Sequence, residues 1–300
     1  MKVLVTGARG KVGRATVDAL VAAGHAVRAT DRLAPGFDSS DRQDGVDYVQ
    51  AELTDPRDCY ALTVGVDAVV HAGNIPDPTQ NTPHTVFRNN LMSTFNLLEA
   101  AVRLTVPRFV FISSETVPGF FFAERSFLPH YAPVDEHHPC APQDPYAQSK
   151  YFGEQLMDAA VARSGIRAIS LRPTWVQTPR TYEQNLGAQV RDASVLTANL
   201  WSYVDVFDLA DAIVLAVASE LPGHEVMYIA APDNVGGHDF AQSLRRFYGN
   251  RIELRGLDRP DASGISAAKA QRLLGWVPTR SWRNYLDEDG RTLTGVAGAA

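Results

Sequence analysis

The chain has 300 residues, 45% of them hydrophobic and 21% charged, which is the composition of an ordinary globular protein with a large core. Its formal net charge of −6 argues against a protein that binds nucleic acid through the phosphate backbone. No apolar run reaches the roughly 18 residues of a membrane-spanning helix, so no membrane segment is expected.

Short apolar runs alternate with helical patterns through the first half of the chain. Strands are expected at 2–6, 25–31, 46–53, 66–73, 107–114 and 166–172. Helices are expected at 11–24, 82–105 and 145–163. Strands that alternate with helices indicate parallel crossovers, so the sequence predicts an α/β fold with a doubly wound parallel sheet.

The alternation breaks after Pro173. The elements expected beyond it are a strand edge and a helix over 204–219, a strand at 225–230, and helices near 238–248, 266–274 and 281–289. The sequence therefore predicts a sheet domain over 1–172 and a smaller substrate lobe over 173–300, with 204–232 returning to pack on the first. The tail TGVAGAA, from Thr294, is expected to fray.

Cys59 and Cys140 lie far apart and form no metal or redox motif. Reduced cysteines, and a chain that enters a strand at once without a cleavage region, predict a cytoplasmic protein. His137 and His138 lie near Cys140 in a proline-rich loop without a second ligand pair, so no metal is expected.

The turn after the first strand reads TGARGKVG, with glycines at 7, 10 and 13. Gly7 permits a tight turn, Gly10 lets the backbone approach a pyrophosphate, and Gly13 lets the helix pack closely on the sheet. The helix amides then face the phosphates, which predicts a dinucleotide site. The expected site also includes the intervening residues Arg9, Lys11 and Val12.

Asp31 ends the second predicted strand. A carboxylate there can accept hydrogen bonds from an adenosine ribose and repels a 2′-phosphate, so NAD is the expected cofactor. Arg9 and Arg32 flank the same region, which leaves NADP possible. The alternative to a dinucleotide site is a glycine turn with a structural role only, beside a surface aspartate.

The stretch DPYAQSKYFGE, residues 144–154, predicts a helix that begins after the cap Asp144. Tyr146 and Lys150 are four residues apart and share one helix face. The charge of Lys150 is expected to lower the pKa of Tyr146, which can then exchange a proton with an alcohol or ketone. Lys150 can also hold the nicotinamide ribose. Tyr151 points elsewhere and is expected to pack.

Further motifs extend along nearly the whole chain. They are AELTD (51–55), VVHAG (69–73), NNLMSTFNLLEAA (89–101), FVFISSETVPG (109–119), YAQSK (146–150), YVDVFDLADAI (203–213) and KAQRLLGWVP (269–278). With TGARGKVG, this order of motifs resembles the extended short-chain dehydrogenases/reductases, the group that contains UDP-galactose 4-epimerase and nucleotide-sugar dehydratases. The resemblance implies a Rossmann-type fold and an NAD-dependent enzyme.

The resemblance also implies roles for single residues. Ser114 takes the Ser/Thr place of the catalytic set beside Tyr146 and Lys150, as a hydrogen-bond donor to the substrate oxygen. The other implied cofactor residues are Glu52 and Leu53 at the adenine, Ala72 and Gly73 beside the cofactor, Asn90 on a helix near the site, and Pro173.

The chain departs from the family after Ser114. Dehydratases carry an Asp-Glu pair there, whereas this chain has Glu115 and Thr116. Elimination of water needs both an acid and a base, so dehydratase activity is disfavoured. Glu115 and Thr116 are instead candidate substrate contacts, and a plain polar loop residue is the alternative for Glu115.

A second departure lies before YVDVFDLAD, where nucleotide-sugar epimerases place an arginine that clamps the pyrophosphate. This chain has Leu200, Trp201 and Ser202, which weakens the case for a nucleotide sugar. Arg255 or Arg259 could supply a phosphate contact, and Arg180 and Arg191 are further candidates. Trp201 could stack on a sugar ring or be an ordinary core tryptophan.

The resemblance predicts hydride transfer at a secondary alcohol or ketone of a sugar, as in a nucleotide-sugar epimerase. One alternative is a dehydrogenase of a free sugar or sugar acid, like uronate dehydrogenase. Another is a non-catalytic dinucleotide sensor, against which Ser114, Tyr146 and Lys150 argue. A homodimer is expected through the helices near 82–105 and 145–163, whose apolar residues include Leu91, Phe95, Leu98 and Val102.

Overall fold

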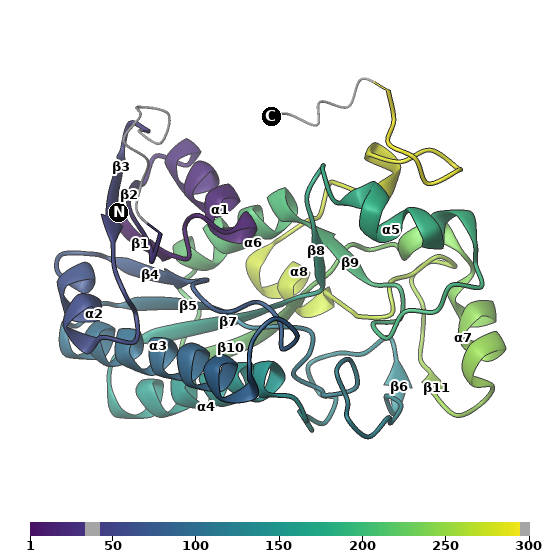
Figure 1. Cartoon of the computed structure of the whole chain (residues 1–300), viewed down its shortest axis with the longest axis horizontal. Helices are drawn as coiled ribbons and strands as arrows, with labels where there is room; N and C mark the ends of the chain where they lie inside the picture. Colours follow the sequence, from purple (N-terminus) through teal and green to yellow (C-terminus); the bar gives the residue numbers. More distant parts are fainter. Residues whose placement is uncertain (34–42, 295–300) are drawn as a thin grey trace.

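The computed structural model describes residues 1–33 and 43–294, so the predicted fraying beyond Thr294 lies outside the described residues. Within that part, seven strands form one parallel sheet in the order β10-β7-β5-β4-β1-β2-β3 (Figure 1). The strands are β1 (Lys2–Thr6), β2 (Ala26–Asp31), β3 (Val46–Gln50), β4 (Ala68–His71), β5 (Arg108–Ile112), β7 (Arg167–Pro173) and β10 (His224–Ile229). This confirms the predicted Rossmann-type doubly wound sheet.

Helices cover both faces of this sheet (Figure 1). One face carries α1 (Lys11–Ala22) and α6 (Val206–Ala218), and the other carries α2 (Pro56–Thr63), α3 (Pro83–Arg103) and α4 (Pro145–Arg163). Side chains alternate along β1, because Val3 and Val5 enter the core on the α1 side and Leu4 enters the core on the α3 side. Both faces of β1 are therefore buried, which explains its unbroken apolar run.

The start of α4 is set by Asp144. Its Oδ1 accepts hydrogen bonds from the amides of Tyr146 and Ala147, at 3.0 and 2.9 Å. Pro145 follows as the first helical residue, where it loses no helical hydrogen bond. The cap fixes the rotation of the helix, and with it the face on which Tyr146 lies.

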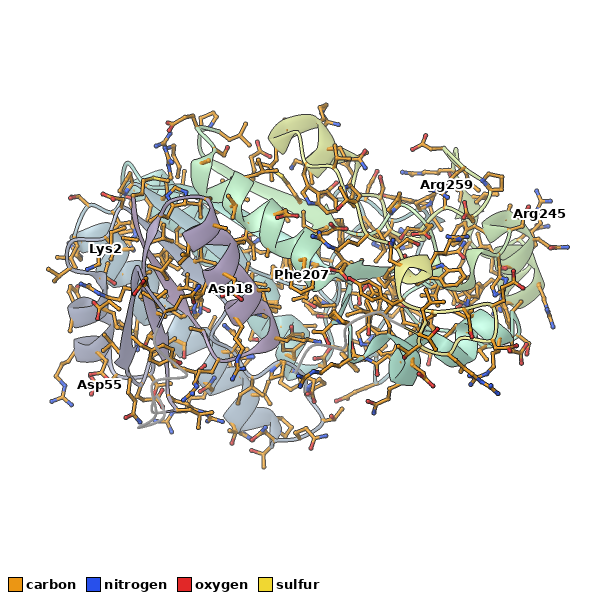
Figure 2. All side chains as sticks on the ribbon, turned by 90° about the horizontal axis from the view of Figure 1, so that it is seen from above. Lys2, Asp18, Asp55, Phe207, Arg245 and Arg259 are labelled. Carbon is orange, nitrogen blue, oxygen red and sulfur yellow. The ribbon has the colours of Figure 1, made fainter. Side chains whose placement is uncertain are left out.

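A smaller group of elements packs beyond the carboxyl ends of the strands. Its elements are the strand pairs β6 (Tyr131–Ala132) with β11 (Glu253–Leu254) and β8 (Trp175–Gln177) with β9 (Tyr203–Asp205), the helices α5 (Tyr182–Arg191), α7 (Phe240–Tyr248) and α8 (Ala268–Leu274), and the 3₁₀ turns η2 (Val235–Gly237) and η3 (Trp282–Asn284). Figure 2 shows Arg245 and Arg259 at this end of the molecule and Lys2 and Asp55 at the other.

The helix expected near 281–289 is wrong, because only the short turn η3 forms there. Tyr285 instead stacks on Tyr182, with ring centroids 4.2 Å apart, and Leu286 forms a bridge with Thr292. These contacts with distant residues outweigh the local helical pattern.

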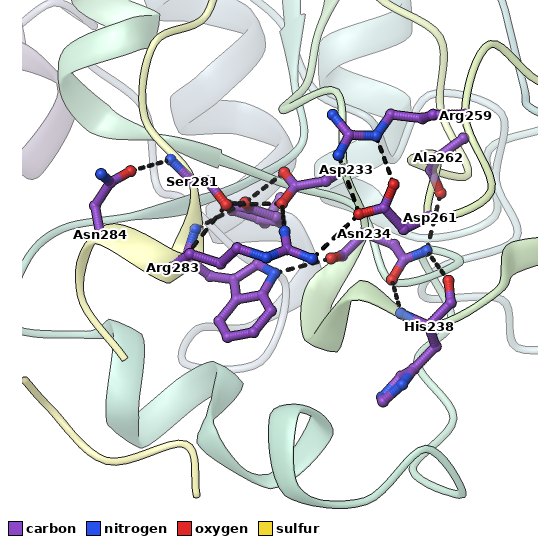
Figure 3. A network of polar contacts seen from close by, with 11 residues as sticks. Asp233, Asn234, His238, Arg259, Asp261, Ala262, Ser281, Arg283 and Asn284 are labelled. Atoms are coloured by element: carbon purple, nitrogen blue, oxygen red, sulfur yellow. Dashed lines mark hydrogen bonds and ion pairs between the residues drawn. The ribbon is translucent and has the colours of Figure 1, made fainter. Parts of the chain in front are cut away.

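A polar network holds this C-terminal segment in place (Figure 3). Asp233 is 2% exposed and accepts hydrogen bonds from Tyr203 and Ser281, both at 2.7 Å, and pairs with Arg283. Asp261 pairs with the same arginine at 3.1 Å. The network satisfies a buried carboxylate and fastens the last described residues to the lobe.

Segment 204–232 contributes to the central layers, because α6 packs against α1 and β10 pairs with β7. The division of the chain into 1–172 and 173–300 stays a prediction. Among residues 1–33 and 43–294, no helix is both long and apolar enough to cross a bilayer.

Candidate active site

A cavity of about 250 Å³ opens at the carboxyl ends of β1, β2 and β4. The sheet order reverses direction there, since β4 and β2 lie on opposite sides of β1, and doubly wound sheets bind ligands at such a point. The predicted cofactor residues that line the cavity are Gly7, Gly10, Asp31, Arg32, Glu52, Leu53, Ala72 and Gly73.

The glycine turn leaves no room for side chains. Gly7 has φ of +65°, and a Cβ on it would lie 2.7 Å from the Cα of Gly73. A Cβ on Gly13 would lie 2.1 Å from the carbonyl oxygen of Gly7. Helix α1 begins just after Gly10, so its first amides face the cavity without a capping side chain. This cradle of bare backbone fits the pyrophosphate of a dinucleotide.

Asp31 is held at the edge of the cavity. Its Oδ2 accepts a hydrogen bond from the amide of Arg9 at 3.1 Å, and its Oδ1 accepts one from the amide of Leu33 at 3.3 Å. The carboxylate is thereby fixed where the ribose of an adenosine would lie. Arg32 also lines the cavity, while the guanidinium of Arg9 lies over the ring of Tyr48.

Three other predicted cofactor residues act at a distance from this cavity. Lys11 donates from Nζ to the carbonyl of Val176 at 3.0 Å, and Val12 packs against the core. Asn90 is fully buried and bonds to both the amide and the carbonyl of Ile75, at 2.8 and 3.0 Å. Ile75 lines the cavity, so Asn90 shapes the wall without reaching it.

The structure brings the proposed catalytic side chains together. Tyr146, Lys150 and Ser114 are 9%, 3% and 6% exposed. Nζ of Lys150 lies 5.6 Å from the ring centroid of Tyr146 and donates to the carbonyl of Ile112 at 2.7 Å. Thr116 donates to the hydroxyl of Ser114 from its amide and its own hydroxyl, at 3.2 and 3.0 Å.

The pKa of Tyr146 departs from the expectation. Burial raises it to about 12, although a hydrogen bond with Ser114 lowers it, and nearby carboxyl groups such as Asp144 and Glu115 raise it further. Burial also lowers the pKa of Lys150 to about 7, against the opposing charge of Glu154. The predicted lowering of the Tyr146 pKa is wrong for this structure, because desolvation of the phenol is the largest effect and raises the pKa.

A buried ion pair behind Lys150 was not predicted. Glu154 accepts from Nε and Nη2 of Arg172 at 2.8 and 2.6 Å, and from the hydroxyl of Ser113 at 2.6 Å. Both side chains are at most 5% exposed. The spacing of Tyr146, Lys150 and Glu154 at four-residue steps was the available signal, since it places all three on one face.

Pro173 and Glu115 lie in contact next to the proposed catalytic serine, Ser114. The carbonyl of Pro173 accepts from the amide of Glu115 at 3.1 Å. Glu115 is 8% exposed, and burial raises its pKa well above the usual range, against a hydrogen bond with Asn199. Asn199 was missed because its segment carries no recognisable motif.

Trp201 lies in the core, which corrects its expected place in the substrate site and agrees with the alternative of an ordinary core tryptophan. It is 3% exposed, and its ring packs against Phe240 and Phe247 at centroid distances of 6.2 and 5.6 Å. Its Nε1 donates to the carbonyl of Val195 at 2.9 Å. Trp201 is therefore a core residue.

The two arginines considered for phosphate already have partners. Arg259 forms a two-point contact with Asp261, at 2.5 and 3.1 Å, within the network of Figure 3. Arg255 lies over the ring of Tyr131 at 3.1 Å and pairs with Glu253. In the described ranges, no group of three or more His, Cys, Asp or Glu side chains is arranged to hold a metal ion.

Comparison with known proteins shows to which family the chain belongs. A model of the NAD dependent epimerase/dehydratase family matches residues 3–230. A UDP-glucose 4-epimerase of Streptomyces lividans is 26% identical, over 93% of this chain and 92% of its own. A uronate dehydrogenase of Pseudomonas putida is 26% identical, over 78% of this chain and 77% of its own.

A solved structure of a short-chain dehydrogenase/reductase superfamily protein from Agrobacterium tumefaciens, with bound NAD, superposes with a TM-score of 0.70. The two proteins are 25% identical, and the match covers 94% of each chain. The family match spans the glycine cradle, Asp31 and the three proposed catalytic side chains. The chain belongs to the NAD dependent epimerase/dehydratase family and is an NAD-dependent enzyme of the extended short-chain dehydrogenase/reductase type.

Proposed function

We propose that this protein oxidises a secondary alcohol of a free sugar or sugar acid, with NAD as the hydride acceptor. The observation that carries the proposal is the meeting of Ser114, Tyr146 and Lys150 beside the glycine cradle. Ser114 donates a hydrogen bond to the substrate oxygen, and Tyr146 takes the hydroxyl proton as hydride leaves the same carbon. Lys150 holds the nicotinamide ribose.

Among the described residues, the two arginines considered for phosphate, Arg255 and Arg259, are already paired, which favours a substrate without a nucleotide. Leu200 and Trp201 are buried where related epimerases carry an arginine, and Arg259 is paired with Asp261. A diphosphate in this lobe would have to draw Arg255 from Glu253 or Arg259 from Asp261. The likeness to uronate dehydrogenase agrees with this choice.

Nucleotide-sugar epimerisation is the second candidate. The likeness to a UDP-glucose 4-epimerase over 93% of the chain favours it. In that reaction the ketone stays bound, turns over and takes the hydride back on its other face. The catalytic side chains serve both outcomes, so the substrate decides between them.

The test is a screen for NAD reduction with free sugars and sugar acids, beside an epimerase assay on UDP-sugars. NAD reduction by a free sugar or sugar acid that UDP at millimolar concentration leaves unaffected is the expected result. Interconversion of UDP-sugars, inhibited by UDP and weakened by Arg259→Ala, would favour the epimerase. Full activity of Tyr146→Phe would refute both.

A homodimer in the cytoplasm completes the proposal. Met92, Phe95 and Phe152 on α3 and α4 are 40%, 41% and 44% exposed and form an apolar surface. Leu98, named above for this interface, is 2% exposed and belongs to the core. The cytoplasmic location rests on the sequence expectation alone.

A further inference from the structure

Two buried oxygen atoms beside the catalytic serine lack hydrogen-bond partners among the described residues. They are Oε2 of Glu115 and Oδ1 of Asn199. Glu115 is 8% exposed and Asn199 is 6% exposed, and the two side chains lie within hydrogen-bonding reach of each other. An unpartnered oxygen at such depth costs free energy, so a pair of them on facing side chains calls for a physical explanation.

The orientation of the Asn199 amide is fixed by its other end. Its Nδ2 donates to the carbonyl of Ser202 at 2.6 Å, which leaves Oδ1 without a donor. Leu200 and Trp201 follow with φ of 54° and 58°, in the left-handed region that non-glycine residues rarely adopt. The buried ring of Trp201 holds this turn. The turn that places Asn199 beside Glu115 therefore has a backbone conformation that costs free energy.

An ionised Glu115 does not suit these surroundings. The hydrogen bond between Asn199 and Glu115 lowers the pKa of Glu115, but it leaves Oε2 of Glu115 and Oδ1 of Asn199 without partners. Both atoms are acceptors when Glu115 is ionised, so these two would remain unsatisfied. The titratable group that faces Glu115 is the Tyr146 phenol on α4, whose ionisation a carboxylate would oppose. Pro173 from β7 and Asn199 from the segment before β9 do not titrate.

We propose that Glu115 works as a neutral carboxylic acid whose O–H group is donated to Oδ1 of Asn199 in the free enzyme and to an oxygen of the substrate in the complex. The proposal deepens the function proposed above and rests on it for the substrate. A single proton satisfies both unpartnered oxygens. It also removes the negative charge of Glu115 from the surroundings of Tyr146 when the phenol must accept the substrate proton.

The neutral acid defines the chemical class that this position recognises. A donor at Glu115 selects a substrate acceptor, such as a hydroxyl oxygen or the carboxylate of a sugar acid, next to the reacting carbon. A carboxylate at Glu115 would repel a sugar acid. A neutral Glu115 therefore admits either kind of acceptor, whereas an ionised Glu115 would exclude a sugar acid, and Asn199 is its positioning residue.

The first test needs no substrate. The infrared difference spectrum between wild type and Glu115→Gln, recorded at pH 7, is expected to show the C=O band of a protonated carboxyl in wild type only. If only a carboxylate band differs, Glu115 is ionised, a bridging water satisfies the two oxygens, and the proposal is overturned.

The second test uses thermal unfolding. Glu115 keeps its proton in the folded state, whereas in the unfolded chain it loses the proton above its ordinary pKa of 4.5. Rising pH therefore favours unfolding of wild type through this group, whereas Glu115→Gln lacks the group and keeps only the pH dependence that both proteins share. Tm of the variant is expected to exceed that of wild type increasingly from pH 5 to pH 8. A constant difference across this range would contradict a buried neutral acid.

The third test is kinetic and separates this proposal from the proposed function. Glu115→Gln keeps a neutral donor and is expected to retain activity within about tenfold, while Glu115→Ala raises KM more than it lowers kcat. Asn199→Asp adds a charge and is expected to lose activity as the pH rises. If Glu115→Gln abolishes turnover while NAD binding persists, an ionised Glu115 is required and the proposal fails. If wild type oxidises no sugar, the proposed function fails, and the infrared and thermal results still decide the protonation of Glu115.

Discussion

Glu154 and Arg172 form a two-point ion pair, with N···O distances of 2.8 and 2.6 Å. Glu154 lies one helical turn beyond Lys150 on α4, and Arg172 lies on β7. The pair is closed to solvent, and its negative member raises the pKa of Lys150 against the effect of burial. The pKa of Lys150, the proposed catalytic lysine, thus depends on the charge of Glu154.

Replacing Glu154 by Gln should therefore destabilise the protein. Arg172 would keep its charge without a partner, and breaking a buried pair in this way costs about 3–5 kcal/mol. The matched control is Glu99→Gln, which removes a partly exposed partner of Arg163 and should cost less than about 1 kcal/mol. Urea unfolding of both variants measures the difference. Equal losses of unfolding free energy in the two variants would show that the buried ion pair stabilises the protein no more than the exposed one.

Replacing Tyr146 by Phe should lower turnover by roughly 10²-fold or more, because the path for the substrate proton is lost. NAD binding should persist, since the glycine cradle is untouched. Tyr151→Phe is the control, because Tyr151 neighbours Phe152 on another side of α4, with ring centroids 5.8 Å apart. Steady-state kinetics and an NAD titration check this. An unaffected Tyr146→Phe enzyme would place the acid/base elsewhere.

Replacing Asp31 by Ala should narrow the preference for NAD over NADP. The carboxylate is fixed by the amides of Arg9 and Leu33 and repels a 2′-phosphate. Asp18→Ala, on the exposed side of α1, should leave the preference unchanged. Fluorescence titration with NAD and NADP measures this preference in wild type and in both variants. Equal or tighter binding of NADP by wild type would contradict the assignment.

His71 should make stability depend on pH below neutrality. It is fully buried between Thr6 and Thr94, and burial lowers its pKa from 6.5 to about 3, with a smaller effect from Lys150. Between pH 3 and pH 6.5, His71 binds a proton in the unfolded chain but not in the folded protein. Stability should therefore fall with pH from 6.5 towards 3, by up to about 1.4 kcal/mol per pH unit from this group.

The control for this dependence is His71→Asn, which cannot titrate. Its free energy of unfolding should fall less steeply than that of wild type between pH 6.5 and 4.5. Parallel curves for the two proteins would show that other groups, rather than His71, carry the acid sensitivity.

Replacing Phe95 and Phe152 by Glu should give a monomer, if α3 and α4 form the proposed dimer interface. Both rings are more than 40% exposed, and charges there would have to be buried on association. Light scattering at micromolar concentration compares the double variant with wild type. A monomeric wild type would refute the dimer.

The sequence predicted those parts of the fold that local chemistry decides. Asp144 and Pro145 mark the start of α4, and the structure places both where expected. Asp55 and Pro56 carry the same signal for α2, which was missed because AELTD was interpreted as a cofactor motif. The strands β6 and β11 have two residues each, too few to show a periodic pattern.

The remaining errors concern residues whose surroundings come from distant parts of the chain. Trp201 is buried by Phe240 and Phe247, and nothing near it in sequence announces this. The pKa of Tyr146 depends on burial, which the spacing to Lys150 does not reveal. Asn199 acquires its place beside Glu115 only through the folded lobe.

The return of α6 and β10 to the central layers has a consequence for any attempt to express the parts of this chain separately. A fragment ending at Arg172 would lose β10, the strand that pairs with β7, and would expose backbone groups along that edge. It would also lose α6, whose Leu209 and Ile213 are fully buried over the sheet. The truncated half is therefore expected to aggregate, and a working enzyme needs the chain to remain continuous through Ile229.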